Sequence, residues 1–233
     1  VLDIWKRAAP SLDLMCPDIY SPAKRDFTRI ASRYDREDNA LFIPESITMG
    51  EASAMNMLLA VADYGAIGIC GFGAESTLAN DGTLLPEAQT VAGSMRAIRN
   101  LEPLLIRYRK TGRVHAFVQD EFSKEQYLRL DKYHVVAHFL RDNPGYIGVG
   151  SKINMKNPEN RGHLQERGRG LFVEAGEDEF YLAGAGIGLE IIRRPPPDDT
   201  NPHAHITSRQ SSQLNFLSVE EGHFEDGVWV VDY

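Results

Sequence analysis

The stretch Ala40–Tyr64 reads ALFIPESITMGEASAMNMLLAVADY and decides the fold of the N-terminal half. Its first part, Ala40–Glu45, is a short apolar run that predicts a buried β-strand. Its second part, Glu51–Tyr64, has Ala, Met and Leu at helical spacing, and Gly65 supplies a C-terminal stop. A strand followed by a helix is the repeating unit of parallel α/β folds.

Two further apolar segments, Leu12–Tyr20 and Ala66–Phe72, repeat the strand pattern on either side. The three segments start about 26–28 residues apart, a period typical of βα units. Pro86–Tyr108 is expected to be helical and to kink or split at Pro103, because proline removes an i→i−4 hydrogen bond. The N-terminal half is therefore predicted to contain three parallel βα units, from an open sheet or from a (β/α)8 TIM barrel.

The second half changes character after about Gly112 and shows no long helical period. Short β-branched or alternating segments are separated by Gly, Pro and Asn clusters, which predicts an all-β, sandwich-like domain. We therefore expect one domain over residues 1–112 and a β-rich domain over residues 113–233. The expected strands are Arg113–Gln119, Tyr127–Phe139, Gly170–Ala175, Glu179–Ala183, Ile187–Arg193, Gln213–Val219 and Val228–Tyr233.

Composition excludes several classes of protein. The 233 residues carry a net charge of −8, which argues against a nucleic-acid binder, and 42% are hydrophobic, enough for a folded core. No run approaches the roughly 18–20 apolar residues that span a membrane. Two cysteines, Cys16 and Cys70, exclude a disulfide framework and a four-cysteine zinc site, and both are expected to be buried free thiols.

The start of the chain suggests a piece of a longer protein. It opens at Val1 within a helix-like segment, without an initiator Met or a signal peptide. The cellular location is left open, with secretion or the periplasm favoured. A homo-oligomer is equally left open.

Polar and aromatic side chains follow each of the three predicted strands. Asp18 and Tyr20 end the first strand, Glu45 ends the second, and Phe72 and Glu75 follow the third. Functional residues of βα-repeat folds lie at the carboxyl ends of the strands. These five residues are therefore the candidate site.

Glu45 is the most telling of these residues, because it ends an apolar strand. Side chains alternate along a strand, so Leu41, Ile43 and Glu45 are expected to share one face. Two carboxylates around an oxocarbenium-like transition state perform glycoside hydrolysis, and a nearby phenol can hold one of them ionised. From spacing alone, a strand-end acid that caps the next helix or pairs with an arginine remains an equal alternative.

Several longer segments resemble known hydrolases. The segments LDIWKRAAPSLDLMCPDIYSP, DNALFIPES and YGAIGICGFGAES are similar to the last third of the catalytic barrel of β-galactosidase-type enzymes of glycoside hydrolase family 35, a relative of family 42. The segments GRGLFVEAGEDEFYLAGAGIGLEII and SVEEGHFEDGVWV resemble the β-rich C-terminal domain of a bacterial and fungal branch of these enzymes. The resemblance covers nearly the whole chain.

The resemblance implies a role for each candidate residue. Glu45, on the seventh barrel strand, matches the catalytic nucleophile, and Tyr20, on the sixth, matches the tyrosine that contacts it. Phe72 and Glu75 match the lining of the sugar subsite, and Asp18 joins them as a substrate-binding candidate. The reaction needs no metal or organic cofactor, and its substrate would be a β-galactoside or a related oligosaccharide.

One departure from the family pattern limits this prediction. The acid/base glutamate of these enzymes lies on the fourth strand, and strands one to five have no counterpart here. The isolated chain is therefore expected to be inactive and to need the missing N-terminal half of the barrel as its partner. The alternatives left open are Glu75 as the second carboxylate, a non-catalytic carbohydrate-binding or structural module, and a related hydrolase acting on another β-glycoside.

Three other patterns are interpreted as structural. Gly184–Gly188 lacks the helix that a dinucleotide-binding loop requires and predicts a hairpin or bulge. The basic segment Arg161–Arg169 is expected to be a solvated loop. His163, His203 and His205 lack a fixed set of three ligands and are expected in exposed loops, not in a metal site.

Overall fold

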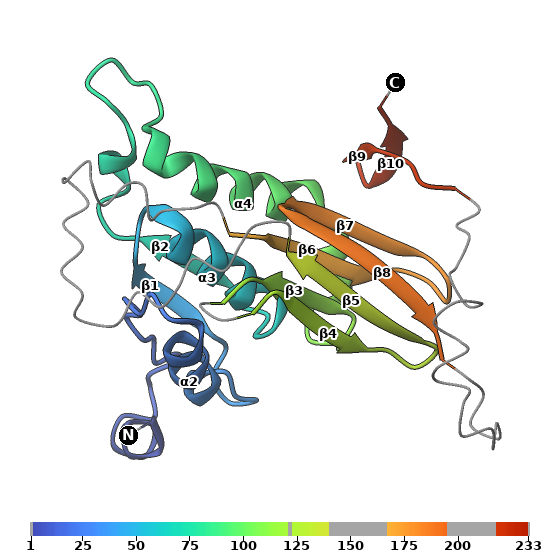
Figure 1. Ribbon diagram of the computed structural model, residues 1–233. Coiled ribbons are helices and arrows are strands. Elements are labelled where there is room, and N and C mark those ends of the chain that lie inside the picture. The colour runs from blue at the N-terminus through green and yellow to red at the C-terminus, as the bar shows by residue number, and fades with distance from the viewer. Residues whose placement is uncertain (1, 121–122, 140–166, 195–217, 233) are drawn as a thin grey trace.

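The structure is a computed structural model that describes residues 2–120, 123–139, 167–194 and 218–232 (Figure 1). Helices dominate up to residue 108 and strands follow. The helices are α1 (Leu2–Ala8), α2 (Lys24–Tyr34), α3 (Gly50–Ala62), α4 (Gln89–Asn100) and α5 (Glu102–Tyr108), with short 3-10 turns η1 (Ala74–Thr77) and η2 (Pro86–Ala88). The strands are β1 (Phe42–Ser46), β2 (Gly68–Gly71), β3 (Val114–Val118), β4 (Glu125–Arg129), β5 (Tyr133–Phe139), β6 (Arg169–Glu174), β7 (Phe180–Ala185), β8 (Ile187–Arg193), β9 (Gly222–Glu225) and β10 (Val228–Val231).

The N-terminal half contains a small parallel sheet formed by β1 and β2. Both strands and the helix α3 between them were predicted, and the split of the Pro86–Tyr108 helix at Pro103 is confirmed by the break between α4 and α5. Helix α2 was not predicted. The two described strands do not close a barrel, so the TIM-barrel assignment stays a prediction.

The predicted strand Leu12–Tyr20 was wrong in extent. Within it, a single parallel bridge joins Ile19 to Ser46, and the rest is extended chain without a ladder. The reason is that a side chain takes the place of a neighbouring strand: the Asn39 amide accepts the Met15 N–H at 2.9 Å and donates to the Met15 carbonyl at 3.0 Å.

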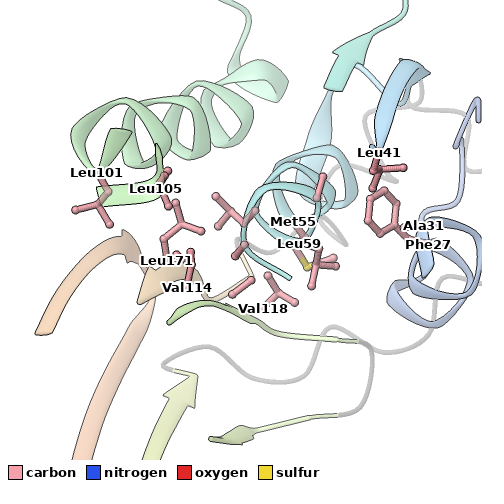
Figure 2. Close-up of a cluster of buried hydrophobic side chains, with 14 of the residues drawn as sticks. Phe27, Ala31, Leu41, Met55, Leu59, Leu101, Leu105, Val114, Val118 and Leu171 are labelled. Carbon is pink, nitrogen blue, oxygen red and sulfur yellow. The ribbon is translucent and has the colours of Figure 1, made fainter. Parts of the chain in front are cut away.

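Helix α3 is buried on all sides and forms the centre of the molecule. It lies between the parallel pair β1–β2 and the antiparallel strands (Figure 1). On one side Met55 and Leu59 face Phe27 and Leu41, and on the other the same cluster continues to Leu171 (Figure 2). A helix that is apolar all round is suited to such a position. The hydrophobic core therefore runs across residue 112 without interruption.

The C-terminal half contains two three-stranded antiparallel sheets, β3–β6–β7 and β4–β5–β8. A second apolar cluster, which includes Phe117, Tyr133, Phe172 and Ile191, joins the two sheets. Phe172 stacks on Phe180 with ring centroids 5.4 Å apart. Aromatic contacts of this kind add to the stabilisation from buried area.

The sequence-based strand boundaries needed two corrections in this half. The segment predicted as one strand, Tyr127–Phe139, is the hairpin β4–β5, closed by a hydrogen bond from the Leu130 N–H to the Tyr133 carbonyl at 2.8 Å. Strand β9 was not predicted, and most of the expected strand Gln213–Val219 lies outside the described residues. The hairpin or bulge expected at Gly184–Gly188 was wrong: Gly186, at φ +67°, lies in the turn between β7 and β8, and these strands pair with β6 and β5 in two separate sheets.

A buried arginine joins the β6 strand to two helices. The Arg169 Nη1 lies 3.3 Å from Glu51 Oε2 on α3, and its Nε donates to Ser94 Oγ on α4 at 3.1 Å. Nη1 and Nη2 also donate to the carbonyls of Arg167 and Thr90, at 3.1 and 3.0 Å. The carboxylate of Glu51 additionally accepts the Arg167 N–H at 3.1 Å.

This junction corrects the expectation that Arg161–Arg169 is a solvated loop. Residues 161–166 lie outside the described part, but Arg167 and Arg169 are only 5% and 3% exposed. A guanidinium can be buried this deeply because its fork of donors meets a carboxylate, a hydroxyl and two carbonyls. Its removal would take away the cation that lies 3.3 Å from the buried Glu51 carboxylate.

We predict that Arg169→Met destabilises the chain by about 3–5 kcal/mol, the range found when one partner of a buried ion pair is removed. Urea unfolding followed by circular dichroism measures this. The matched control is Lys132→Ala, which removes an exposed ion pair with Glu177 and is expected to cost less than about 1 kcal/mol. Equal effects of the two substitutions would contradict the structural role of Arg169.

The C-terminal hairpin β9–β10 packs on β7 through three aromatic rings. Trp229 meets Tyr181 and Phe224 edge-on, with centroids 5.2 Å apart in both pairs. On the same hairpin, His223 Nδ1 lies 2.7 Å from Asp232 Oδ1, and its Nε2 lies 3.2 Å from Glu225 Oε1. Hydrogen bonds to Glu225 and then to Asp232 raise the pKa of His223 above its ordinary value of 6.5.

This geometry predicts that the hairpin is held more firmly at mildly acidic pH. Because the pKa is raised in the folded state, the stabilisation is complete below pH 6.5 and is lost as pH rises through the folded-state pKa. Protection factors of the β9–β10 amides, measured by hydrogen exchange, should be lower at a pH above the raised folded-state pKa than at a pH below 6.5. In His223→Gln they should be equal at both values, and an unchanged difference in that variant would disprove the assignment.

Candidate functional site

The candidate site lies at the carboxyl end of the parallel pair β1–β2. The Glu45 carbonyl accepts the Ile19 N–H at 2.9 Å, and the Ser46 carbonyl accepts the Phe72 N–H at 3.0 Å. The Ser46 hydroxyl also donates to the Cys70 carbonyl at 2.8 Å. The backbone around Glu45 is therefore held from both neighbouring segments.

Tyr20 and Glu45 meet directly at this end of the sheet. The Tyr20 phenol donates a hydrogen bond to Glu45 Oε2 at 2.8 Å. Tyr20 is 48% exposed and Glu45 is partly buried, so the pair lies at the surface of the described structure. The phenol therefore bonds to one of the two carboxylate oxygens of Glu45, Oε2.

The orientation of Glu45 differs from the alternation expected for a regular strand. Leu41 and Ile43 are fully buried, as predicted, but the register with β2 shifts between Ile43 and Ser46. This bulge places one extra residue in β1, so that Ser46 is buried and Glu45 is only partly buried. The expectation that Leu41, Ile43 and Glu45 share one face was therefore wrong at its last residue.

The surroundings of Tyr20 keep its phenol protonated. Desolvation, the hydrogen bond to Glu45 and the negative charges of Glu45 and Asp18 together raise the pKa of Tyr20 to about 12. All of these causes disfavour a phenolate next to a carboxylate. Tyr20 is therefore a stable hydrogen-bond donor to Glu45 throughout the neutral range.

Within the described residues, the other three candidates are not bonded to this pair. Asp18 is exposed and near enough to Tyr20 for its charge to raise the tyrosine pKa. Phe72 follows β2 and is 64% exposed, and the Thr48 hydroxyl donates to its carbonyl. Glu75 lies in the exposed turn η1, and within the described residues no hydrogen bond or ion pair joins it to Tyr20 or Glu45.

One face of the parallel sheet lacks a covering layer in the part of the chain described. Cys70 in β2 and Phe72 just after it are exposed, whereas Leu41 and Ile43 on the α3 side are fully buried. The expectation of buried thiols was therefore wrong for Cys70, and Cys16 is only partly buried. Parallel sheets are normally covered on both faces. The Cys70 thiol is exposed because this face is open in the described part of the chain.

Sequence reasoning missed one residue of the site region, Asn56 on α3. Its Nδ2 donates to the Ser21 carbonyl at 3.0 Å, next to Tyr20. The signal in the sequence was an amide in the middle of the apolar run AMNMLL. Such a residue is usually present for a specific hydrogen bond.

No group of three or more His, Cys, Asp or Glu is arranged to hold a metal ion in the described ranges. His163, His203 and His205 lie outside those ranges. Among the described helices, none has the length and apolar character needed to cross a lipid bilayer.

Comparison with known families gives one match. A family model described as a domain of unknown function, DUF5597, matches residues 91–232. The chain belongs to this family. The DUF5597 match begins within α4 and continues through β10, so Tyr20 and Glu45 precede it. No curated protein matches the chain.

The Tyr20–Glu45 pair makes a prediction for Glu45→Gln. Removal of the carboxylate charge should lower the pKa of Tyr20 from about 12 part of the way towards its ordinary value of 10, because desolvation remains. Alkaline titration with 13Cζ-labelled tyrosine measures this. Tyr181, whose pKa is also raised to about 12 beside Glu179, is the internal control and should not change. An unchanged Tyr20 titration would show that the pair does not form.

Proposed function

We propose that the chain is the C-terminal part of a retaining, exo-acting glycoside hydrolase of the β-galactosidase type. In this proposal residues 1–112 contribute the last three βα units of a TIM barrel, and residues 113–233 form a β-rich domain that supports them. Glu45 is the nucleophile, Tyr20 orients it, and Asp18, Phe72 and Glu75 contribute to binding a β-galactoside. The remaining strands of the barrel come from further polypeptide.

The observation that carries the proposal is the hydrogen bond from Tyr20 to Glu45 at 2.8 Å, at the carboxyl end of parallel strands. A carboxylate nucleophile must be ionised and aimed, and a protonated phenol supplies both conditions. The alternative roles considered for Glu45, capping of α3 or pairing with an arginine, receive no support within the described residues: Met49 precedes α3 with no side-chain cap, and none of the ion pairs found there includes Glu45. A strand-end carboxylate bonded to a phenol and open to solvent is suited to attack a bound sugar.

The mechanism proceeds in two displacements. In the first, a Glu45 carboxylate oxygen forms a bond to the anomeric carbon, the glycosidic C–O bond breaks, and the leaving oxygen takes a proton from a general acid. In the second, the same group, now a base, takes a proton from water, whose oxygen bonds to the anomeric carbon as the bond to Glu45 breaks. Tyr20 keeps its own proton throughout and stabilises the carboxylate each time it is released.

In this proposal the second carboxyl group, the general acid and base, comes from further polypeptide. Retaining enzymes place their two carboxyl groups about 5–5.5 Å apart across the scissile bond. Glu75 is the alternative considered for this role, but it lies in an exposed 3-10 turn, and within the described residues it is not bonded to the pair. The face of the β1–β2 sheet that the described residues leave open supports a partner segment, since a parallel sheet needs cover on both faces.

The test is a kinetic comparison on an aryl β-galactoside. In the complete barrel, Glu45→Gly should lower kcat/KM at least about 1,000-fold, because the covalent step is lost. Added azide should restore turnover by entering the vacated position and should give an α-galactosyl azide. The 233-residue chain by itself should show no turnover.

The control variant is Glu75→Gly, which removes a binding-site carboxylate and should raise KM without gaining any rescue by azide. Turnover by the isolated chain, or azide rescue of Glu75→Gly in place of Glu45→Gly, would overturn the assignment of Glu45.

A further inference from the structure

Asn56 occupies a position on α3 where an amide is unfavourable for folding. It is 1% exposed, and its helix neighbours Met55, Met57 and Leu58 are buried apolar residues. Only one end of the amide has a partner: Nδ2 donates to the Ser21 carbonyl at 3.0 Å, while within the described residues nothing bonds to Oδ1. A buried oxygen without a partner destabilises the fold, and a leucine of similar size would avoid that loss.

The one hydrogen bond that Asn56 makes lies next to Tyr20. The residue before Tyr20 is tied to β1, because the Ile19 N–H donates to the Glu45 carbonyl at 2.9 Å. The residue after it is tied to α3, because Ser21 accepts from Asn56. The backbone of Tyr20 is therefore fixed on both sides. The bond before it joins two backbone groups, whereas the bond after it comes from the Asn56 side chain.

Helix α3 holds the backbone next to both members of the Tyr20–Glu45 pair. Helix α3 follows β1 after a short loop, so its first turn fixes the chain beyond Glu45. That turn is itself anchored through Glu51 to Arg169 on β6. Asn56, further along the helix, reaches back to the segment of Tyr20. A rigid element that holds both partners can set the distance between them.

We propose that Asn56 is a positioning residue, which holds the Tyr20 phenol on the Glu45 carboxylate by fixing the Ser21 carbonyl. Its catalytic meaning rests on the proposed function, but the positioning itself is a property of this chain. In this proposal Oδ1 stays without a partner because the amide is oriented to place Nδ2 on the Ser21 carbonyl.

The test uses the 233-residue chain with 13Cζ-labelled tyrosine at neutral pH. The Tyr20 signal is assigned with Tyr20→Phe, and Glu45→Ala supplies the chemical shift of a phenol that has lost its acceptor. In Asn56→Leu, the Tyr20 signal should move at least about half of the way to that reference. Thermal unfolding should stay within a few degrees of the wild type, because the same substitution removes the unsatisfied oxygen.

Two further variants make the result specific. Asn56→Asp keeps the shape but replaces the donor by an acceptor, so it should move the Tyr20 signal as Asn56→Leu does. Ser53→Ala, one turn earlier on α3, removes another buried oxygen that has no partner in the described part, and it should leave Tyr20 unchanged. A shift caused equally by Ser53→Ala would indicate a general loosening of the helix and would overturn the proposal.

The remaining outcomes are also decisive. An unmoved Tyr20 signal in folded Asn56→Leu and Asn56→Asp would overturn the proposal, and so would failure of both variants to fold, since Asn56 would then serve the fold alone. In the complete barrel, Asn56→Leu should lower kcat more than it changes KM. If the barrel proves to have no glycosidase activity while the Tyr20 signal moves as expected, the proposed function fails and the positioning role stands.

Discussion

A parallel β-sheet needs a covering layer on each face, and this requirement governs the arrangement of the chain. Helix α3 covers one face of β1–β2 with Met55, Leu58 and Leu59. The same helix presents its other side to the antiparallel sheet β3–β6–β7, whose Leu171 belongs to the same apolar cluster. The second face of β1–β2, where Cys70 is exposed, has no such cover in the described part of the chain.

The two halves are joined by polar as well as apolar contacts. The Arg169 side chain connects β6 to α3 and α4 through Glu51, Ser94 and a backbone carbonyl. Since α3 follows the strand that carries Glu45 after a short loop, the buried Arg169 junction ties the β-rich half to the candidate site. In this account the C-terminal sheets do more than extend the core, because they fix the helix from which Tyr20 and Glu45 are positioned.

Local pattern was sufficient to predict the elements with strong periodicity. The apolar run before Glu45 and the Ala- and Met-rich helix after it were predicted from spacing alone, as was the helix break at Pro103. The resemblance to glycoside hydrolases brought Tyr20 and Glu45 together as candidates, and they are hydrogen-bonded. Their catalytic roles remain a proposal.

Other features depend on long-range partners that a sequence pattern does not reveal. The segment Leu12–Tyr20 has strand character, but the side chain of Asn39 bonds the N–H and the carbonyl of Met15 in its middle. The arginines of the basic segment are buried because Glu51 lies more than a hundred residues earlier in the chain yet adjacent in space. The bulge in β1 reorients Glu45 through a register shift that alternation cannot predict.

The most direct test of the central claim is covalent trapping of the nucleophile. A 2-deoxy-2-fluoro-β-galactoside with a good leaving group, applied to the complete barrel, should leave one fluorosugar bound as an ester, which peptide mass spectrometry can locate. The account predicts that the label is on Glu45 in the peptide that contains FIPES. A label on any other carboxylate, or none in an enzyme that turns over β-galactosides, would contradict it.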